Sequence, residues 1–183
     1  YTQHTEEFYD FYKNKMIFLD AKPNKAHLKL AEMERAGKLS AIVTQNIDGL
    51  HQAAGSKNVF ELHGSVHRNY CQKCGKFFDV NYVVNAKGVP YCDECGGIIK
   101  PDVVLYEEGL DSQTINGAVR AISKADMLII GGTSLVVYPA AGMIDYFKGK
   151  YLAVLNRDAT SRDKQADLCI TDPIGEVLGR IRV

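Results

Sequence analysis

Residues 127–135 read Met-Leu-Ile-Ile-Gly-Gly-Thr-Ser-Leu, an apolar run followed at once by two glycines and two hydroxyl side chains. A short run that is apolar at every position is typical of a strand buried on both faces of a parallel sheet. The glycines let the backbone approach a ligand closely, and Thr133 and Ser134 can bond a phosphate or a ribose. The segment matches neither the dinucleotide fingerprint nor the phosphate loop of nucleoside triphosphatases, so the pattern alone does not settle a phosphate site.

Further apolar runs alternate with segments of helical periodicity along the chain. Predicted strands lie at residues 41–43, 58–62, 103–106, 151–155 and 168–170. Predicted helices lie at residues 5–19, 24–36, 112–124, 139–147 and 174–181. This alternation predicts an α/β fold, a parallel sheet with helices on both faces. Ligands of such sheets bind at the carboxyl ends of the strands, which places candidate loops after Val43, Leu62, Tyr106, Ile130 and Leu155.

The composition is that of a globular chain of one domain, or of one domain with a small insertion. The 183 residues include 22 Lys plus Arg and 22 Asp plus Glu, so the formal net charge is zero. A neutral chain has no general electrostatic attraction for nucleic acid or for an anionic membrane. No apolar run approaches the roughly 20 residues that a membrane-spanning helix needs, and no signal peptide is recognisable. We therefore expect neither nucleic acid nor membrane as a partner.

Four of the five cysteines form two Cys-x-x-Cys pairs, Cys71 with Cys74 and Cys92 with Cys95. Two such knuckles make a tetrahedral zinc site, and four protein ligands leave the zinc ion no open position for catalysis. We predict a structural zinc site, with two reducible disulfides or free thiols as the alternative. Paired cysteines in a neutral α/β chain also indicate a cytoplasmic protein rather than a secreted disulfide framework.

A zinc ribbon by itself suggests nucleic-acid binding as a rival function. Residues 67–100 contain five basic and three acidic side chains. The formal excess of two positive charges is cancelled by the net charge of −2 of a zinc ion with four thiolates. The ribbon is therefore not a basic patch, which argues against that rival.

Polar side chains follow other predicted strands. Residues 44–51 read Thr-Gln-Asn-Ile-Asp-Gly-Leu-His, and their amides and carboxylate either converge on a ligand or satisfy their own turn. His63 comes just after another strand and precedes Gly64. A histidine can act as a general base near neutral pH, although a lone histidine is more often a packing residue. The predicted strand at residues 151–155 is followed by Asn156, Arg157 and Asp158. These polar residues either bond a ribose or form a plain turn.

Together these motifs resemble the sirtuin family of NAD-dependent protein deacylases. The matching segments are residues 44–51, residues 62–64, both cysteine pairs, and residues 100–104, 132–135 and 155–156. They follow the order of the family and span nearly the whole chain from residue 44 onward. The resemblance implies a Rossmann-like NAD-binding domain at residues 1–65 and 102–183, with a zinc-binding insertion at residues 66–101.

The resemblance also implies roles for single residues. His63 is the expected catalytic base, while Gln45 and Asn46 contact the nicotinamide ribose or order water there. Asp48 is expected to hydrogen-bond the nicotinamide amide, with Ile47 beside it. The other expected NAD contacts are Gly132, Thr133, Ser134, Asn156, Arg157, Asp158 and Ile174. The expected substrate contacts are Val104 and Tyr106 in an acyl-lysine tunnel and the backbone of Leu135, Val136 and Val137, which pairs with the peptide as an added strand.

The implied activity is NAD-dependent removal of acyl groups from protein lysines, with nicotinamide and O-acyl-ADP-ribose as products. Two alternatives stay open, an ADP-ribosyltransferase with the same NAD pocket and a non-catalytic module that binds NAD or ADP-ribose. Tyr12 and Lys15 stand where sirtuins that favour succinyl groups carry a Tyr-x-x-Arg pair. Lysine lacks the planar fork that grips a carboxylate at two points, which favours acetyl as the substrate group.

The chain departs from the family pattern at two places. The Gly-Ala-Gly strand-turn and the cofactor loop of the family would lie before Tyr1, and without them we expect weaker NAD binding or failure to fold alone. Many family members have Phe-Gly-Glu where this chain has Tyr106, Glu107 and Glu108. A side chain in place of that glycine is expected to change how the substrate peptide fits.

Overall fold

A computed structural model of the chain describes Tyr1 and residues 3–183. The chain forms two compact units. The first comprises Tyr1–Ala21, Asn46–Gly49 and His63–Gly109, and the second comprises Lys22–Gln45, Leu50–Leu62 and Leu110–Val183. The predicted insertion at residues 66–101 lies within the first unit. Its status as a separate domain beside residues 1–65 and 102–183 stays a prediction.

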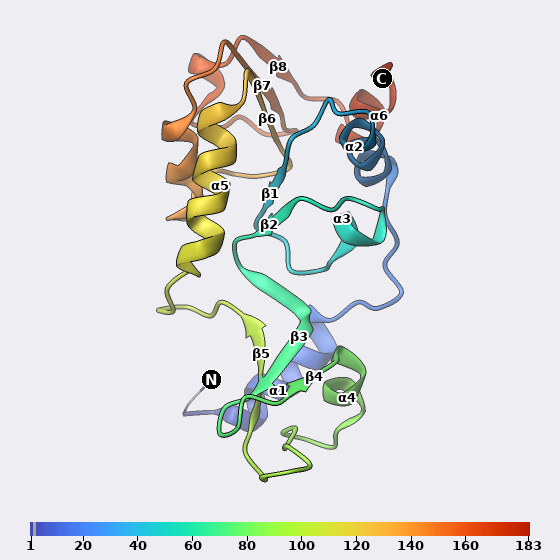
Figure 1. The fold of residues 1–183 in the computed structure, drawn as a ribbon, viewed down its shortest axis with the longest axis vertical. Coiled ribbons are helices and arrows are strands. Elements are labelled where there is room, and N and C mark those ends of the chain that lie inside the picture. Colours follow the sequence, from blue (N-terminus) through green and yellow to red (C-terminus); the bar gives the residue numbers. More distant parts are fainter. Residues whose placement is uncertain (2) are drawn as a thin grey trace. The chain divides into compact units, whose positions relative to one another are not determined.

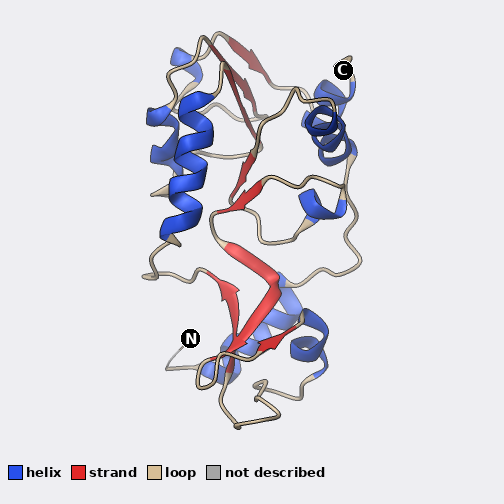
Figure 2. Ribbon diagram, viewed as in Figure 1, coloured by secondary structure: helices blue, strands red, loops and turns tan. Residues whose placement is uncertain are grey.

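The second unit contains two parallel sheets (Figures 1 and 2). In one sheet, β1 (Ile42–Thr44) pairs with β2 (Val59–Glu61). In the other, the strand order is β6 (Met127–Gly131), β7 (Tyr151–Leu155) and β8 (Leu168–Ile170). The central strand β7 is buried from its second residue to its last, as expected for a strand covered on both faces. The predicted parallel α/β fold is confirmed.

Helices cover both faces of the β6-β7-β8 sheet. Successive side chains of β7 point to opposite faces, so they pack against different helices. Ala153 and Leu155 pack in one cluster with side chains of α2 (Lys25–Arg35) and α6 (Ile174–Gly179). The side chain of Val154 belongs to another cluster, which includes Ile144 of the 3-10 helix η2 (Ala140–Tyr146). The two helical layers therefore lie on opposite faces, as the sequence predicts.

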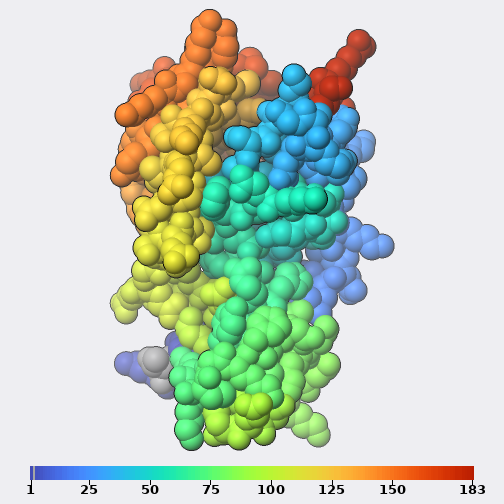
Figure 3. Space-filling model, viewed as in Figure 1, coloured from blue at the N-terminus to red at the C-terminus, as the bar shows by residue number. Residues whose placement is uncertain are grey.

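Polar caps set the starts of the long helices in the second unit. Asn24 caps α2 in a capping box, in which its Oδ1 accepts from the His27 amide at 3.2 Å and His27 Nδ1 accepts from the Asn24 amide at 3.3 Å. Asp111 caps α5 (Ser112–Lys124) by accepting from the Thr114 amide at 2.7 Å, and this bond holds the pKa of the Asp111 carboxyl below its usual range. The solvent-facing side of α5 is the yellow column in Figure 3.

The first unit is built on an antiparallel sheet in the order β4-β3-β5. Its strands are β3 (Gly64–Cys71), β4 (Phe77–Phe78) and β5 (Ile99–Val103), and α4 (Val80–Asn85) follows β4. α1 (Thr5–Phe11) continues into a π-helix, η1 (Tyr12–Met16), and these helices supply the fully buried Tyr9 and Tyr12. The Tyr9 hydroxyl donates to the Ile99 carbonyl of the sheet, and burial raises the pKa of both tyrosines.

Several predicted elements differ from the structure. The strand predicted at residues 103–106 is wrong, because β5 ends at Val103 and pairs antiparallel with β3 instead of joining a parallel sheet. The helix predicted at residues 5–19 ends at Met16, where the extended backbone of Ile17 stops it. The prediction omits β3, β4, α4, α3 (Leu50–Ala53) and the 3-10 helix η3 (Asp163–Gln165). Within Tyr1 and residues 3–183, no helix combines the length and the apolar character needed to cross a membrane.

Candidate active site and metal centre

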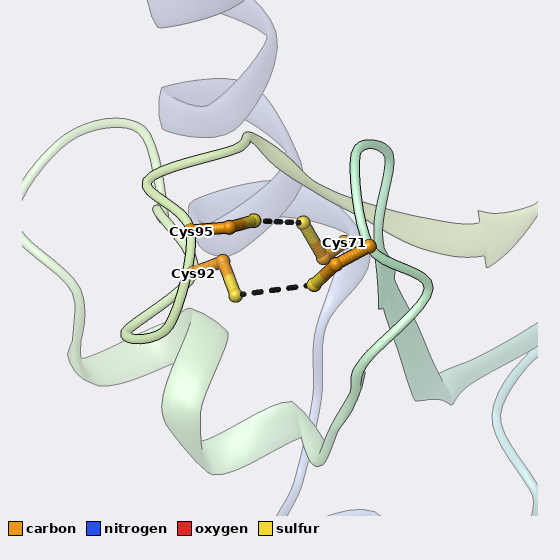
Figure 4. A group of neighbouring side chains, drawn as sticks. Cys71, Cys92 and Cys95 are labelled. Atoms are coloured by element: carbon orange, nitrogen blue, oxygen red, sulfur yellow. Dashed lines mark hydrogen bonds between the residues drawn. The ribbon is translucent and has the colours of Figure 1, made fainter.

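The four predicted zinc ligands lie together in the first unit (Figure 4). Their sulfur atoms are all within 4.8 Å of one another. The Sγ atoms of Cys71 and Cys95 are 3.3 Å apart, and those of Cys74 and Cys92 are 3.7 Å apart. Sulfurs placed tetrahedrally at about 2.3 Å from a zinc ion are about 3.8 Å from each other. The four side chains therefore fit a zinc ion, and none of them is in a disulfide.

Four thiols this close together cannot all ionise without a cation. Burial raises the pKa of Cys71, but the Cys74 and Lys73 amides and the neighbouring thiols outweigh burial and lower that pKa to about 6. The Lys76 amide favours the Cys74 thiolate, yet the neighbouring thiols and burial raise the Cys74 pKa to about 12. A divalent cation removes this conflict because it neutralises the thiolates that it binds.

The two knuckles are held close by a glycine and by a lysine. A Cβ atom at Gly97 would lie 2.8 Å from Cys71 Sγ, so a larger residue at this position would push the knuckles apart. Lys76 Nζ lies 2.8 Å from Asp93 Oδ1 and 3.1 Å from Glu94 Oε1, which links the first knuckle to the second. Contacts of the protein itself therefore hold the four cysteines close together.

The first unit also holds most of the predicted catalytic segment. Asn46–Gly49 and His63 belong to this unit, whereas Gln45 belongs to the second. The Val66 amide donates to the Ile47 carbonyl at 3.0 Å, and the Ile47 side chain packs against the core of the unit. These contacts anchor the segment on the strand that follows His63.

Backbone pairing joins His63 to one of the predicted substrate contacts. The His63 carbonyl accepts from the Val104 amide at 3.0 Å, and the next residue, Gly64, pairs with Val103 of β5. Val104 is half-buried, whereas Tyr106 is fully exposed. The structure therefore brings the predicted base beside Val104 and leaves Tyr106 outside the core of the unit.

In the second unit, the glycine loop after β6 is open. Gly132 has a φ of +62°, and no atom lies within 4 Å of where its Cβ would be. Its amide donates to the Leu155 carbonyl at 3.2 Å, which ties the loop to the end of β7. Thr133 Oγ1 accepts from the buried Leu135 amide at 3.2 Å, while Ser134 is exposed. Open backbone and hydroxyl groups at the carboxyl end of a parallel strand suit the phosphate and ribose groups of a dinucleotide.

The remaining predicted cofactor residues lie beside that loop. Asn156 follows β7, and its side-chain amide donates to the Asp158 carbonyl at 2.8 Å. Arg157 and Asp158 are exposed. Ile174, at the start of α6, packs on Gly131, where a Cβ atom would overlap the Ile174 Cδ1 atom. The structure brings these residues to the carboxyl end of the β6-β7-β8 sheet.

The predicted peptide-pairing stretch follows the glycine loop. Leu135 is buried and has a φ of 56° in the left-handed region. Val136 and Val137 are exposed. Their backbone pairing with a substrate peptide stays a prediction.

Comparison with known proteins decides the family. The Sir2 family profile matches residues 1–139, more than half of the chain. The chain belongs to the Sir2 family. A Sir2 relative from Clostridium acetobutylicum, named NAD-dependent protein deacetylase, is 65% identical over 179 residues, which cover 97% of this chain and 73% of the relative. A relative of the same name from Clostridium perfringens is 63% identical over 182 residues, covering 99% of this chain and 75% of the relative.

Solved Sir2 structures share this fold. A structure of Sir2 with a p53 peptide and NAD+ matches with a TM-score of 0.91 at 40% identity, covering 98% of this chain and 77% of that one. A structure of Sir2 with the inhibitor EX-527, 2′-O-acetyl-ADP-ribose and a deacetylated p53 peptide matches with a TM-score of 0.91 at 43% identity, covering 98% and 79%. The resemblance to sirtuins is confirmed.

The sequence prediction missed one residue of the Sir2 segment around Asp48. His67 Nε2 lies 3.0 Å from the Asp48 carbonyl oxygen. The two residues are 19 positions apart in the chain, so no local pattern connects them. Only the pairing of β3 with the Asn46–Gly49 segment brings them together.

Glu107 stands at the position where many Sir2 members have glycine, and its φ of 73° is in the left-handed region. A non-glycine residue in this conformation costs about 1–2 kcal/mol, and the greater chain entropy of glycine offsets about 0.5–1 kcal/mol of that. We expect Glu107→Gly to raise the free energy of unfolding by up to about 1.5 kcal/mol, measured by urea denaturation. A variant that is less stable than the wild type would contradict this account of the backbone.

Proposed function

We propose that the chain is an NAD-dependent protein-lysine deacylase that acts on acetyl-lysine and yields nicotinamide and O-acyl-ADP-ribose. The observation that carries the proposal is the 3.0 Å backbone hydrogen bond between His63 and Val104, next to the strand that anchors Asn46–Gly49. The proposal is supported because the candidate base, a candidate acyl-lysine contact and the candidate nicotinamide-binding segment all belong to one unit. The relatives named NAD-dependent protein deacetylase and a Sir2 structure with an acetylated peptide support the same activity.

Four polar residues act at the nicotinamide and its ribose in this proposal: Gln45, Asn46, Asp48 and His63. NAD, when bound, supplies nicotinamide as a leaving group and a ribose that accepts the acyl group. His63 takes a proton from a ribose hydroxyl, which makes that oxygen nucleophilic. Asp48 accepts a hydrogen bond from the nicotinamide amide, with Ile47 beside it. Asn46 and Gln45 orient water and the ribose.

The second unit holds the other candidate contacts to the dinucleotide, and both units hold candidate substrate contacts. Its open loop and the adjoining turn hold the pyrophosphate and the adenosine through Gly132, Thr133, Ser134, Asn156, Arg157, Asp158 and Ile174. The substrate peptide adds as a strand along Leu135 and Val136, and its acyl-lysine enters beside Val104 and Tyr106.

Zinc in this proposal has a structural role, because four thiolates complete its coordination. Its ligands are Cys71, Cys74, Cys92 and Cys95. The partner is an acylated protein or peptide, with no part for nucleic acid or membrane. A cytoplasmic location is proposed because the paired cysteines suit metal binding rather than a disulfide framework.

The test is mass spectrometry of an acetyl-lysine peptide incubated with NAD and the full-length protein. We expect loss of acetyl only when NAD is present, with formation of O-acetyl-ADP-ribose. His63→Ala is expected to lower the rate by about 10²–10⁴-fold, the usual contribution of a general base. His4→Ala is the matched control, because the His4 side chain is 68% exposed before α1, and it should keep the wild-type rate.

Other products would identify other functions. ADP-ribose attached to protein would make the chain an ADP-ribosyltransferase. Binding of labelled ADP-ribose without turnover would make it a binding module. The deacylase proposal fails if neither acetyl nor longer or acidic acyl groups are removed.

A further inference from the structure

His67 is carried on an irregular part of β3. The pairing of β3 with β5 shifts register between Ser65 and Asn69, and His67 lies in that interval. Its backbone amide donates to Ser65 Oγ at 3.3 Å, and the Ser65 side chain is buried. This hydrogen bond fixes the backbone from which the exposed His67 imidazole projects.

The imidazole of His67 contacts the backbone of Asp48 and Gly49. His67 Nε2 lies 3.0 Å from the Asp48 carbonyl oxygen. A carbonyl oxygen only accepts hydrogen bonds, so Nε2 carries the proton and donates. A Cβ atom at Gly49 would lie 2.7 Å from His67 Cδ2, so the ring packs directly on this glycine. Gly49 is also in the left-handed region, with a φ of +70°.

Two successive residues of β3 therefore hold two successive carbonyls of the segment. The Val66 amide donates to the Ile47 carbonyl, and the His67 ring donates to the Asp48 carbonyl. The Val66 bond uses only backbone atoms, so any residue except proline can make it at position 66. The second bond depends on the histidine side chain, or on another side chain that places an N–H group at the position of Nε2.

We propose that His67 is a positioning residue for the nicotinamide end of NAD. Its ring holds the backbone that follows the Asp48 Cα atom, while the Val66 amide holds the carbonyl that precedes it. Together the two contacts set the direction of the Asp48 carboxylate. His67 acts through Asp48 and has no contact with NAD in this scheme. The inference rests on the proposed function only in assigning Asp48 to the nicotinamide amide.

The test compares the binding of two ligands that differ at the nicotinamide end. Calorimetry on the full-length protein gives the dissociation constants of NAD and of ADP-ribose, which lacks nicotinamide. His67→Ala should weaken NAD binding by about two- to tenfold, the effect of one hydrogen bond, and leave ADP-ribose binding unchanged. His67→Gln keeps an N–H donor and should bind NAD more tightly than His67→Ala. His4→Ala should bind both ligands like the wild type.

A general structural defect gives a different pattern. If His67→Ala weakens NAD and ADP-ribose equally, or weakens neither, the positioning role is wrong. A wild-type protein that binds NAD without deacetylating the peptide refutes the deacylase proposal alone, because the two binding constants still test His67. A wild-type protein that binds no NAD refutes both.

Discussion

Chelation of zinc is expected to unfold the first unit. Cys71 and Cys92 belong to the same buried cluster as Tyr9, Val83 and Ile99, so the ligands are part of the hydrophobic core. In zinc-finger peptides a structural zinc ion contributes about 10–16 kcal/mol of apparent folding free energy. A whole domain is stable by only about 5–15 kcal/mol. The free energy that the ion contributes is therefore as large as the whole stability of a typical domain, so its loss is expected to unfold the unit.

The measurement combines elemental analysis for zinc with near-ultraviolet circular dichroism before and after treatment with a chelator. The metal-free protein and Cys71→Ser should both lose the tertiary signal of the first unit, which includes Tyr9 and Tyr12. Cys169→Ser is the matched control, because Cys169 is exposed in β8 of the second unit, and it should melt like the wild type. A metal-free protein with an unchanged melting curve would show that the site does not support the fold.

The parts of the fold that the sequence predicted are determined by residues close together in the chain. α5 begins and ends at the predicted residues because Asp111 caps it and apolar side chains recur at helical spacing. β7 was predictable because its residues are continuously apolar, which a strand buried on both faces requires. The zinc site was predictable because the spacing of each Cys-x-x-Cys pair suits one metal, and Gly75 and Gly96 then supply the left-handed turns.

The first unit was less predictable because the periodic pattern of its apolar residues is interrupted. The register shift between Ser65 and Asn69 breaks the alternation that normally identifies a strand, so β3 was missed. α4 is rich in valine, a residue with low helix propensity, and is held by the Asp79 cap and by the burial of Val80 and Val83. The apolar residues 103–106 suggested a parallel strand, but only the partner strand reveals that β5 is antiparallel and ends at Val103.

The candidate site likewise contains residues that the sequence identified and residues that it did not. Residues in short motifs, such as His63 or Thr133, were candidates because they stand at predicted strand ends, and the resemblance to sirtuins gave them their expected roles. Their supports were not, because each comes from a distant segment. The Val104 amide that bonds His63 lies in a segment predicted as a strand of another sheet, and His67 gave no signal at all. A sequence motif therefore locates the chemistry, whereas the contacts that hold it depend on strand pairing.

Gly64→Ala is expected to be strongly destabilising, because it disturbs the strand pairing next to His63. Gly64 has a φ of +76°, and a Cβ atom there would overlap the carbonyl oxygen of Asp102. The left-handed backbone costs alanine about 1–2 kcal/mol. Relief of the overlap has to come from backbone movement between β3 and β5, and overpacking of this kind costs about 1–3 kcal/mol. The expected loss of stability is therefore about 2–5 kcal/mol.

Gly88 provides a matched control in the same unit. Its φ is +66°, and no atom lies within 4 Å of the position of a Cβ. Gly88→Ala should therefore show only the backbone cost of about 1–2 kcal/mol, measured by urea denaturation alongside Gly64→Ala. The difference in stability between the two variants isolates the close approach of β3 to β5.

Because that approach also sets the hydrogen bond from Val104 to His63, Gly64→Ala should lower deacetylation in protein that is still folded, and Gly88→Ala should not. Equal stability and equal activity of the two variants would mean that the Gly64 backbone is not packed against Asp102.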